Sequence, residues 1–125
     1  MRVLIADDQP LFAQALRAAL TDLEIDVIGI AGDGAEAVKL TKDLEPDIVM
    51  LDLEMPQANG FEVMELLNHK RTPARFVVLT GEGTAAKRRR AAELGAMAFL
   101  SKSQSFDHIV ATIRLVGAVA GIAVP

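Results

Sequence analysis

The chain has 125 residues, a net charge of −4 and hydrophobic residues at 51% of its positions, which suits one globular domain with a substantial core. The lack of cysteine excludes disulfide bonds and thiolate metal sites and fits a cytoplasmic protein, and no apolar run is long enough to cross a bilayer. The acidic balance, together with the absence of Trp and Tyr, argues against direct nucleic-acid binding by this domain.

Short apolar runs alternate with segments of helical periodicity along the chain. The runs predict five strands, over residues 2–6, 26–31, 47–52, 75–80 and 96–100. Helices are predicted after them, over residues 10–23, 33–44, 60–67, 84–94 and from about 105 to 116 or beyond. Because the strands are apolar runs and do not alternate, we expect a doubly wound, five-stranded parallel sheet of the flavodoxin-like order 2-1-3-4-5, with five helices on its two faces.

Local signals place the ends of these helices. Pro10 suits the first turn of the first helix, whose buried face should comprise Phe12, Ala15, Leu16, Ala19, Leu20 and Leu23. Asp33 and Glu36 fit a capping box at the second helix, and Gly95 should end the fourth. Either Ser103 or Ser105 should cap the last helix.

The most informative stretch is the third strand, which stops on Asp52. In an open parallel sheet, ligands bind beyond the carboxyl ends of the strands, and this chain places chemically active side chains there. They are Asp7 and Asp8 after the first strand, Asp52 after the third, Thr80 at the end of the fourth and Lys102 after the fifth. Three carboxylates together would repel one another, and a hard, oxygen-bound cation such as Mg²⁺ relieves that repulsion. Together with the lysine and the hydroxyl, the cluster suits a phosphoryl group, with Asp52 as the nucleophile.

With these strand-end residues, the chain resembles the receiver domains of response regulators in two-component signalling, over roughly residues 2–118. Asp52 resembles the phosphoacceptor, and Met55-Pro56 the loop signature that follows it. The remaining positions that carry the resemblance are the acidic pair Asp7-Asp8, the switch hydroxyl Thr80, the switch aromatic Phe99 and the lysine Lys102. The resemblance implies Mg²⁺ held by Asp8, Asp52 and the main-chain carbonyl of Glu54, with Asp7 acting through water.

The resemblance also implies a function. Such a domain accepts a phosphoryl group from a sensor histidine kinase, with at most self-catalysed phosphorylation and dephosphorylation, and then changes its interaction surface. The ending 111–116 with Pro125 resembles receivers joined to a LuxR-type helix-turn-helix output domain, so we expect control of transcription and a phosphorylation-enhanced homodimer. Residues 1–118 would form the receiver and residues 119–125 the start of a linker that is cut before an output domain. Ser103 stands where many receivers have proline, so a cis peptide bond after Lys102 is not expected.

Three other functions are alternatives to a phosphoaccepting receiver. A phosphatase of the haloacid dehalogenase type also uses a strand-end aspartate, but Glu54 stands where its acid/base aspartate would be. A nucleotide-binding module would need a phosphate loop, which the glycines at positions 29, 32 and 34 do not form. A degenerate receiver that serves only as an interaction domain is disfavoured because all of the site residues are present.

Two expectations concern surfaces near the site and on the last helix. Glu54 and Glu82 resemble the variable positions that flank the site, and two acidic groups should slow attack by a hydroxide-like nucleophile. On the last helix, helical spacing gives an inner face of Phe106, Ile109, Val110, Ile113 and Val116. The outer face would then hold His108, Ala111, Leu115 and Val119, with Ile122 if the helix extends that far. The basic run 87–90 on the fourth helix is a competing contact surface.

Overall fold

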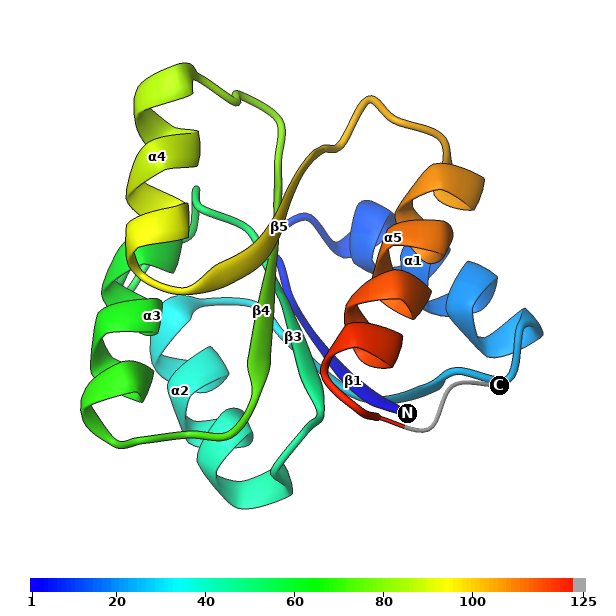
Figure 1. Ribbon diagram of the computed structural model, residues 1–125, viewed down its shortest axis with the longest axis horizontal. Coiled ribbons are helices and arrows are strands. Elements are labelled where there is room, and N and C mark those ends of the chain that lie inside the picture. Colours follow the sequence, from blue (N-terminus) through cyan, green and yellow to red (C-terminus); the bar gives the residue numbers. More distant parts are fainter. Residues whose placement is uncertain (123–125) are drawn as a thin grey trace.

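The computed structural model describes residues 1–122 as a parallel sheet between two layers of helices (Figure 1). The strands are β1 (Arg2–Ala6), β2 (Asp26–Ala31), β3 (Ile48–Leu51), β4 (Arg75–Thr80) and β5 (Ala96–Ser101). The helices are α1 (Pro10–Asp22), α2 (Gly34–Leu44), α3 (Gly60–His69), α4 (Ala85–Glu93) and α5 (Phe106–Val119). All strand pairs are parallel and the order is β2-β1-β3-β4-β5, which confirms the predicted fold.

The two faces of the sheet carry separate apolar cores. Helices α1 and α5 cover one face, and α2, α3 and α4 cover the other (Figure 1). The central strand β3 contributes alternately to both cores, and each of its four residues is 1% exposed or less. Continuous apolar sequence is therefore what this position requires, because a strand covered on both faces has no solvent side.

Side chains cap the starts of α2, α3 and α5, but the full capping box lies at α3 and not at α2 as predicted. The full capping box lies at α3, where Asn59 Oδ1 accepts from the Glu62 amide at 3.0 Å and Glu62 Oε1 accepts from the Asn59 amide at 3.2 Å. At α2 the Asp33 carboxylate accepts from the Glu36 amide at 2.8 Å, so Asp33 is an N-cap and the reciprocal half of the predicted box does not form. Ser105, the second of the two candidates, caps α5.

The buried face of α1 differs from the predicted one. Ala13, Leu16 and Leu20 form its buried stripe, whereas Ala15 is exposed and Leu23, the C-cap, is 38% exposed. The stripe at 13, 16 and 20 keeps the spacing of three and four residues that a helix requires. A stripe that includes Ala15 in place of Ala13 would lie partly on the solvent side of α1.

The end of the described chain folds back on the domain. Helix α5 reaches Val119, Gly121 has φ +76°, and the Ile122 amide donates to the Gly117 carbonyl at 2.8 Å. Ile122 then packs against the core beneath α1 and α5, so it does not continue the outer face of α5. The outer-face expectation for Ile122 was conditional on a longer helix, and α5 ends before this residue. The predicted linker beyond residue 122 lies outside the described residues.

Two further observations concern residues 1–122. No peptide bond in this range is cis, as expected with serine after Lys102. No helix in the same range is long and apolar enough to cross a membrane.

Candidate functional site

Hydrogen bonds that continue the sheet beyond its strands fix the backbone of the predicted site residues. The Asp7 amide donates to the Ala31 carbonyl and the Asp52 amide to the Ala6 carbonyl, each at 2.9 Å. The Lys102 amide donates to the Thr80 carbonyl, also at 2.9 Å. The three functional side chains therefore leave β1, β3 and β5 at the same edge of the sheet, as predicted from the strand ends.

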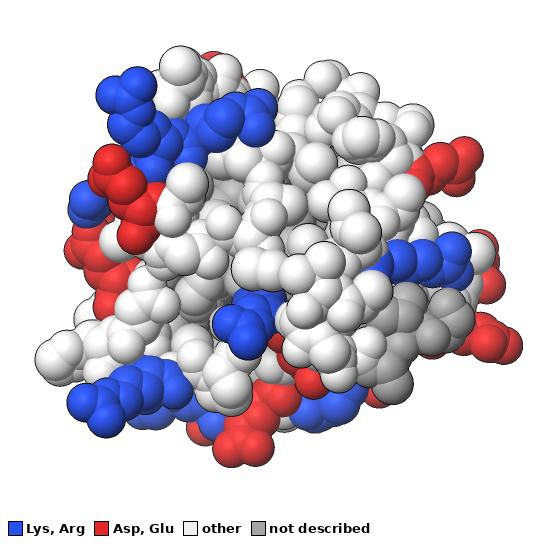
Figure 2. All heavy atoms as spheres, in the orientation of Figure 1, with Lys and Arg blue, Asp and Glu red and all other residues white. Residues whose placement is uncertain are grey.

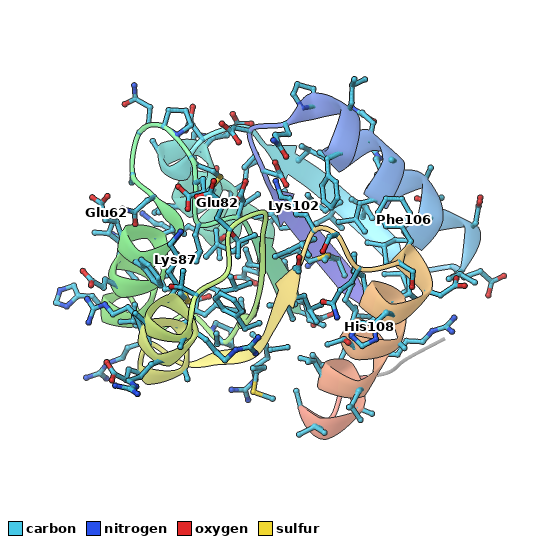
Figure 3. All side chains as sticks on the ribbon, turned by 90° about the horizontal axis from the view of Figure 1, so that it is seen from above. Glu62, Glu82, Lys87, Lys102, Phe106 and His108 are labelled. Atoms are coloured by element: carbon cyan, nitrogen blue, oxygen red, sulfur yellow. The ribbon has the colours of Figure 1, made fainter. Side chains whose placement is uncertain are left out.

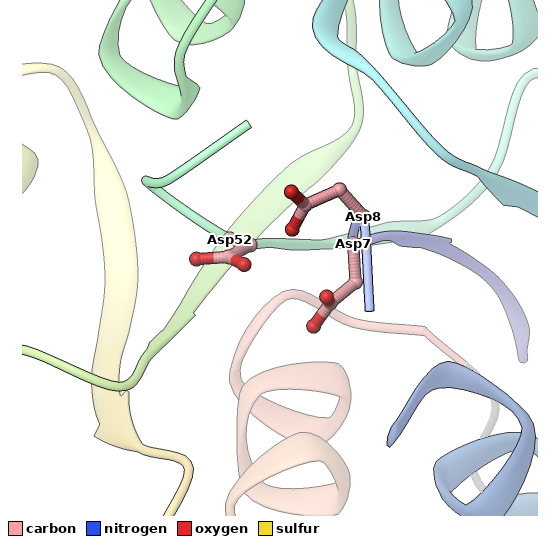
Figure 4. Close-up of side chains that lie close together, drawn as sticks. All are labelled: Asp7, Asp8 and Asp52. Atoms are coloured by element: carbon pink, nitrogen blue, oxygen red, sulfur yellow. The ribbon is translucent and has the colours of Figure 1, made fainter. Parts of the chain in front are cut away.

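Three carboxylates converge at this edge (Figure 4). Asp7, Asp8 and Asp52 each offer one oxygen, and these oxygens all lie within 4.8 Å of one another. Asp7 and Asp52 are buried, at 4% and 3% exposure, whereas Asp8 is exposed. An all-oxygen set with one member open to solvent is the kind of site that Mg²⁺ occupies while keeping several of its waters.

Lys102 lies against two of these carboxylates. Its Nζ is 2.8 Å from Asp7 Oδ2 and 2.9 Å from Asp52 Oδ2. Burial lowers the pKa of Lys102, but hydrogen bonds to Asp7 and Asp52 outweigh that effect and the pKa is raised overall. Lys102 is therefore a permanent positive charge at the site.

The environment of Asp52 keeps its carboxyl less acidic than usual. Burial raises the pKa of Asp52, and the Glu54 amide, which donates to Asp52 Oδ1 at 3.0 Å, and Lys102 only partly offset this. Gly60, the first residue of α3, leaves room for this arrangement, since a β-carbon there would lie 2.6 Å from the Asp52 carbonyl oxygen. The carboxylate lies at the edge of an open pocket of about 500 Å³ lined by Asp8, Gln9, Asp52, Glu54, Gly81, Glu82 and Lys102.

Thr80 and Phe99 lie on neighbouring strands beside the pocket. Thr80 is fully buried, and its Oγ1 accepts from the Glu82 amide at 3.4 Å. Phe99 is half-buried against Gly83, where an added β-carbon would lie 3.0 Å from the ring. The guanidinium of Arg88 lies over the same ring, 4.9 Å from its centroid. Thr80 therefore directly precedes Gly81 and Glu82, which line the pocket, and Phe99 lies against Gly83 just after them.

Glu54 contributes differently from its neighbours. Its main chain is next to Asp52, but its carboxylate points to α4, where Lys87 Nζ lies 2.9 Å from Glu54 Oε1. Lys87 also donates to the Glu82 carbonyl at 3.0 Å. Figure 3 shows Lys87 and Glu82 on the α4 side of the site and Lys102 at its centre.

Three residues of the site have no distinct signal in the sequence. Gln9 Oε1 accepts from Lys102 Nζ at 2.7 Å, the Phe12 ring centroid lies 4.9 Å from the same nitrogen, and Lys87 pairs with Glu54. Pro10 at the start of α1 was the only local signal near the first two. Within the basic run 87–90, Lys87, Arg88 and Arg90 each have a separate partner in the structure.

Comparison with known proteins decides the family. A model described as "Response regulator receiver domain" matches residues 3–114. The chain belongs to this family. The predicted resemblance is thereby confirmed, and the chain is a receiver domain of two-component response regulators.

Curated relatives of this chain are longer than the receiver domain. The transcriptional regulatory protein PdtaR of Mycobacterium tuberculosis is 38% identical over 114 residues, which are 91% of this chain and 55% of PdtaR. A protein-glutamate methylesterase/protein-glutamine glutaminase of Geobacter sulfurreducens is 35% identical over 116 residues, 91% of this chain and 31% of that protein. Among solved structures, a DNA-binding response regulator of the LuxR family from Staphylococcus aureus superposes with a TM-score of 0.87 at 26% identity, covering 92% of this chain and 97% of that one. The receiver thus spans about half of PdtaR and under a third of the methylesterase.

Proposed function

We propose that Asp52 accepts a phosphoryl group and that this reaction is the input of a signalling switch. The observation that carries the proposal is the position of the Asp52 carboxylate, which contacts Lys102, lies within 4.8 Å of the carboxylates of Asp7 and Asp8, and lines an open pocket. In the transfer, an Asp52 oxygen forms a bond to phosphorus, and the bond between phosphorus and the donor breaks. The donor takes the electron pair and a proton.

The remaining residues would stabilise the charge that this reaction gathers. Asp8, Asp52 and the Glu54 carbonyl would hold Mg²⁺, with Asp7 acting through water, and the ion would neutralise phosphoryl oxygens. Lys102, which contacts both Asp7 and Asp52, would supply a second positive charge. Thr80 would donate its hydroxyl hydrogen to a phosphoryl oxygen, and the space that it leaves would let Phe99 turn inward. A charge-assisted hydrogen bond contributes about 1.5–3 kcal/mol, which is enough to shift a loop with two states of similar free energy.

The partners follow from this chemistry. The donor would be a phosphohistidine of a sensor histidine kinase in the cytoplasm, and the domain itself would act as a switch and not as an enzyme on a separate substrate. In the whole protein we propose a DNA-binding output domain that controls transcription, which the similarity to PdtaR and to the LuxR-family structure supports. The methylesterase relative makes an enzymatic output the alternative.

The test uses a small phosphodonor and intact-mass measurement. With acetyl phosphate and Mg²⁺, the parent should gain one phosphoryl group, and Asp52→Asn, which keeps the shape but removes the nucleophile, should gain none. Asp8→Asn should instead weaken Mg²⁺ binding, since it removes one ligand charge. Full labelling of Asp52→Asn would show that the acceptor is elsewhere, and steady hydrolysis of phosphate monoesters would favour a phosphatase.

A further inference from the structure

Gln9 occupies the N-cap of α1 but does not cap it. Its backbone has the extended conformation of an N-cap, with φ −97° and ψ 98°, yet its side chain makes no bond to the first turn of the helix. Glutamine is also not among the side chains preferred at this position, which are Ser, Thr, Asp and Asn. A residue that departs from the local rule in this way is a candidate for a role elsewhere.

The side chain of Gln9 reaches Lys102 instead, across 93 positions of sequence. Gln9 Oε1 lies 2.7 Å from Lys102 Nζ, the shortest of the three contacts of that nitrogen with oxygen atoms. The main chain of Gln9 is held as well, because its amide donates to Asp7 Oδ1 at 2.8 Å and its carbonyl accepts from the Ala13 amide at 3.0 Å. The amide oxygen is therefore presented from a fixed backbone.

An ammonium group has three N–H donors, and the described residues offer Lys102 three acceptors. Two of them, Asp7 and Asp52, are carboxylates that the proposed metal and phosphoryl group would occupy. Gln9 is the third, and neither ligand needs it. Its amide is neutral, so it orients the ammonium without neutralising the charge that the phosphoryl group requires. Phe12 adds an aromatic face on the same side of Lys102, at 4.9 Å.

We infer that Gln9 is a positioning residue for Lys102, which keeps the ammonium aimed into the pocket while its two carboxylate partners are taken by metal and phosphoryl group. This inference rests on the proposed function of the site. Gln9 also lines the pocket itself, so the contact lies where the phosphoryl group would bind. Losing one hydrogen bond to a charged group should weaken binding of a phosphoryl analogue roughly tenfold.

Beryllium fluoride with Mg²⁺ is a suitable analogue. Its binding can be followed by ¹⁹F NMR, since the analogue contains fluorine, whereas the chain has no Trp for a fluorescence assay. Gln9→Leu and Gln9→Ser should both bind it about tenfold more weakly than the parent, with Mg²⁺ affinity unchanged. The serine variant separates two roles, because serine is a good N-cap and should preserve or increase the stability of α1. If Gln9 acted only through the helix, Gln9→Ser would bind like the parent. Gln14→Leu, an exposed glutamine of α1, is the matched control and should change nothing.

Two measurements make the test specific to Lys102. In a Lys102→Met background, Gln9→Ser should cause no further loss, and an undiminished tenfold effect there would overturn the inference. In the parent without any ligand, Lys102 Nζ protons should exchange with water more slowly than in Gln9→Ser, and equal exchange would also overturn it. A parent that binds no beryllium fluoride would refute the proposed function, whereas the exchange measurement would still decide the contact between Gln9 and Lys102.

Discussion

Lys87 of α4 and Glu54 of the loop after β3 form an ion pair beside Asp52, with 2.9 Å between Nζ and Oε1. This pair changes the expectation that Glu54 and Glu82 act as two unopposed negative charges. The hydrogen bond to Glu54 raises the pKa of Lys87, so the lysine stays charged at any physiological pH. The field at the mouth of the pocket therefore depends on three groups, because the charges of both Glu54 and Glu82 act on Lys87.

We predict that Lys87→Met slows loss of the phosphoryl group from Asp52, because it leaves Glu54 and Glu82 to repel a hydroxide-like attacker. Glu54→Gln should speed the loss. Each change should stay within about fivefold, since the side chains are partly exposed and solvent screens them. Decay timed by intact mass in EDTA and in Mg²⁺ tests this. Lys39→Met, which breaks the exposed pair with Asp43, is the control, and an equal effect there would contradict a local cause.

A second prediction concerns Arg88 and Phe99. The Arg88 guanidinium lies over the ring and also donates to the Phe99 carbonyl at 3.5 Å, so it holds the aromatic side chain against Gly83. Arg88→Ala should free the ring to turn inward and tighten beryllium fluoride binding about two- to fivefold, the size of an exposed cation–π contact. The ¹H shifts of the Phe99 ring report the movement. Arg89→Ala, one residue along α4, should leave both the affinity and the shifts as in the parent.

The third prediction is a dependence of stability on pH. Because burial raises the pKa of Asp52, the folded state binds this proton more tightly than the unfolded state. The contribution of Asp52 therefore favours folding in acid and is lost as the pH rises from about 4, the ordinary aspartate value, through the raised value. Asparagine does not titrate, so Asp52→Asn does not lose stability in this way. In EDTA, its free energy of unfolding should therefore rise relative to that of the parent as the pH increases from about 4 through the raised pKa of Asp52.

Urea unfolding at several pH values measures this difference. Asp43→Asn, which removes an exposed carboxylate of α2, is the control and should run parallel to the parent. Adding Mg²⁺ should stabilise the parent more than Asp52→Asn, because a ligand that binds the folded state adds to its stability. A parent and an Asp52→Asn variant with parallel pH profiles would show that Asp52 is not destabilised by burial.

The charged site could be predicted because strand ends can be recognised in the sequence, and the carboxyl ends of parallel strands lie at the same edge of the sheet. Asp7, Asp52 and Lys102 could be placed together for that reason, without any long-range information. Gln9 and Lys87 could not, because their roles depend on where a long side chain points after its backbone is placed. A glutamine at a helix start and a lysine in a basic run are ordinary surface residues by composition, and only the folded arrangement brings them to Lys102 and Glu54.

The two faces of α5 differ in burial. The inner face is as predicted, with Ile109, Val110, Ile113 and Val116 buried and Phe106 packed on the core. On the outer face, Leu115 and Val119 are 64% and 69% exposed. Figure 2 shows that the surface over α5 is mainly uncharged, whereas Lys and Arg gather over α4. We propose that this exposed apolar stripe contacts a second copy of the chain, which would be bound more tightly after phosphorylation.

We predict that Leu115→Glu abolishes this association, because a carboxylate would be buried without a partner at the interface. The cost to folding should be within about 0.5 kcal/mol, since the side chain is mostly exposed in the monomer. Sedimentation velocity with Mg²⁺ and beryllium fluoride should show the parent as a dimer and Leu115→Glu as a monomer. Leu66→Glu is the matched control, because Leu66 is 46% exposed on α3, which covers the other face of the sheet. If Leu115→Glu dimerises like the parent while substitutions in the basic run 87–90 do not, the contact surface is α4.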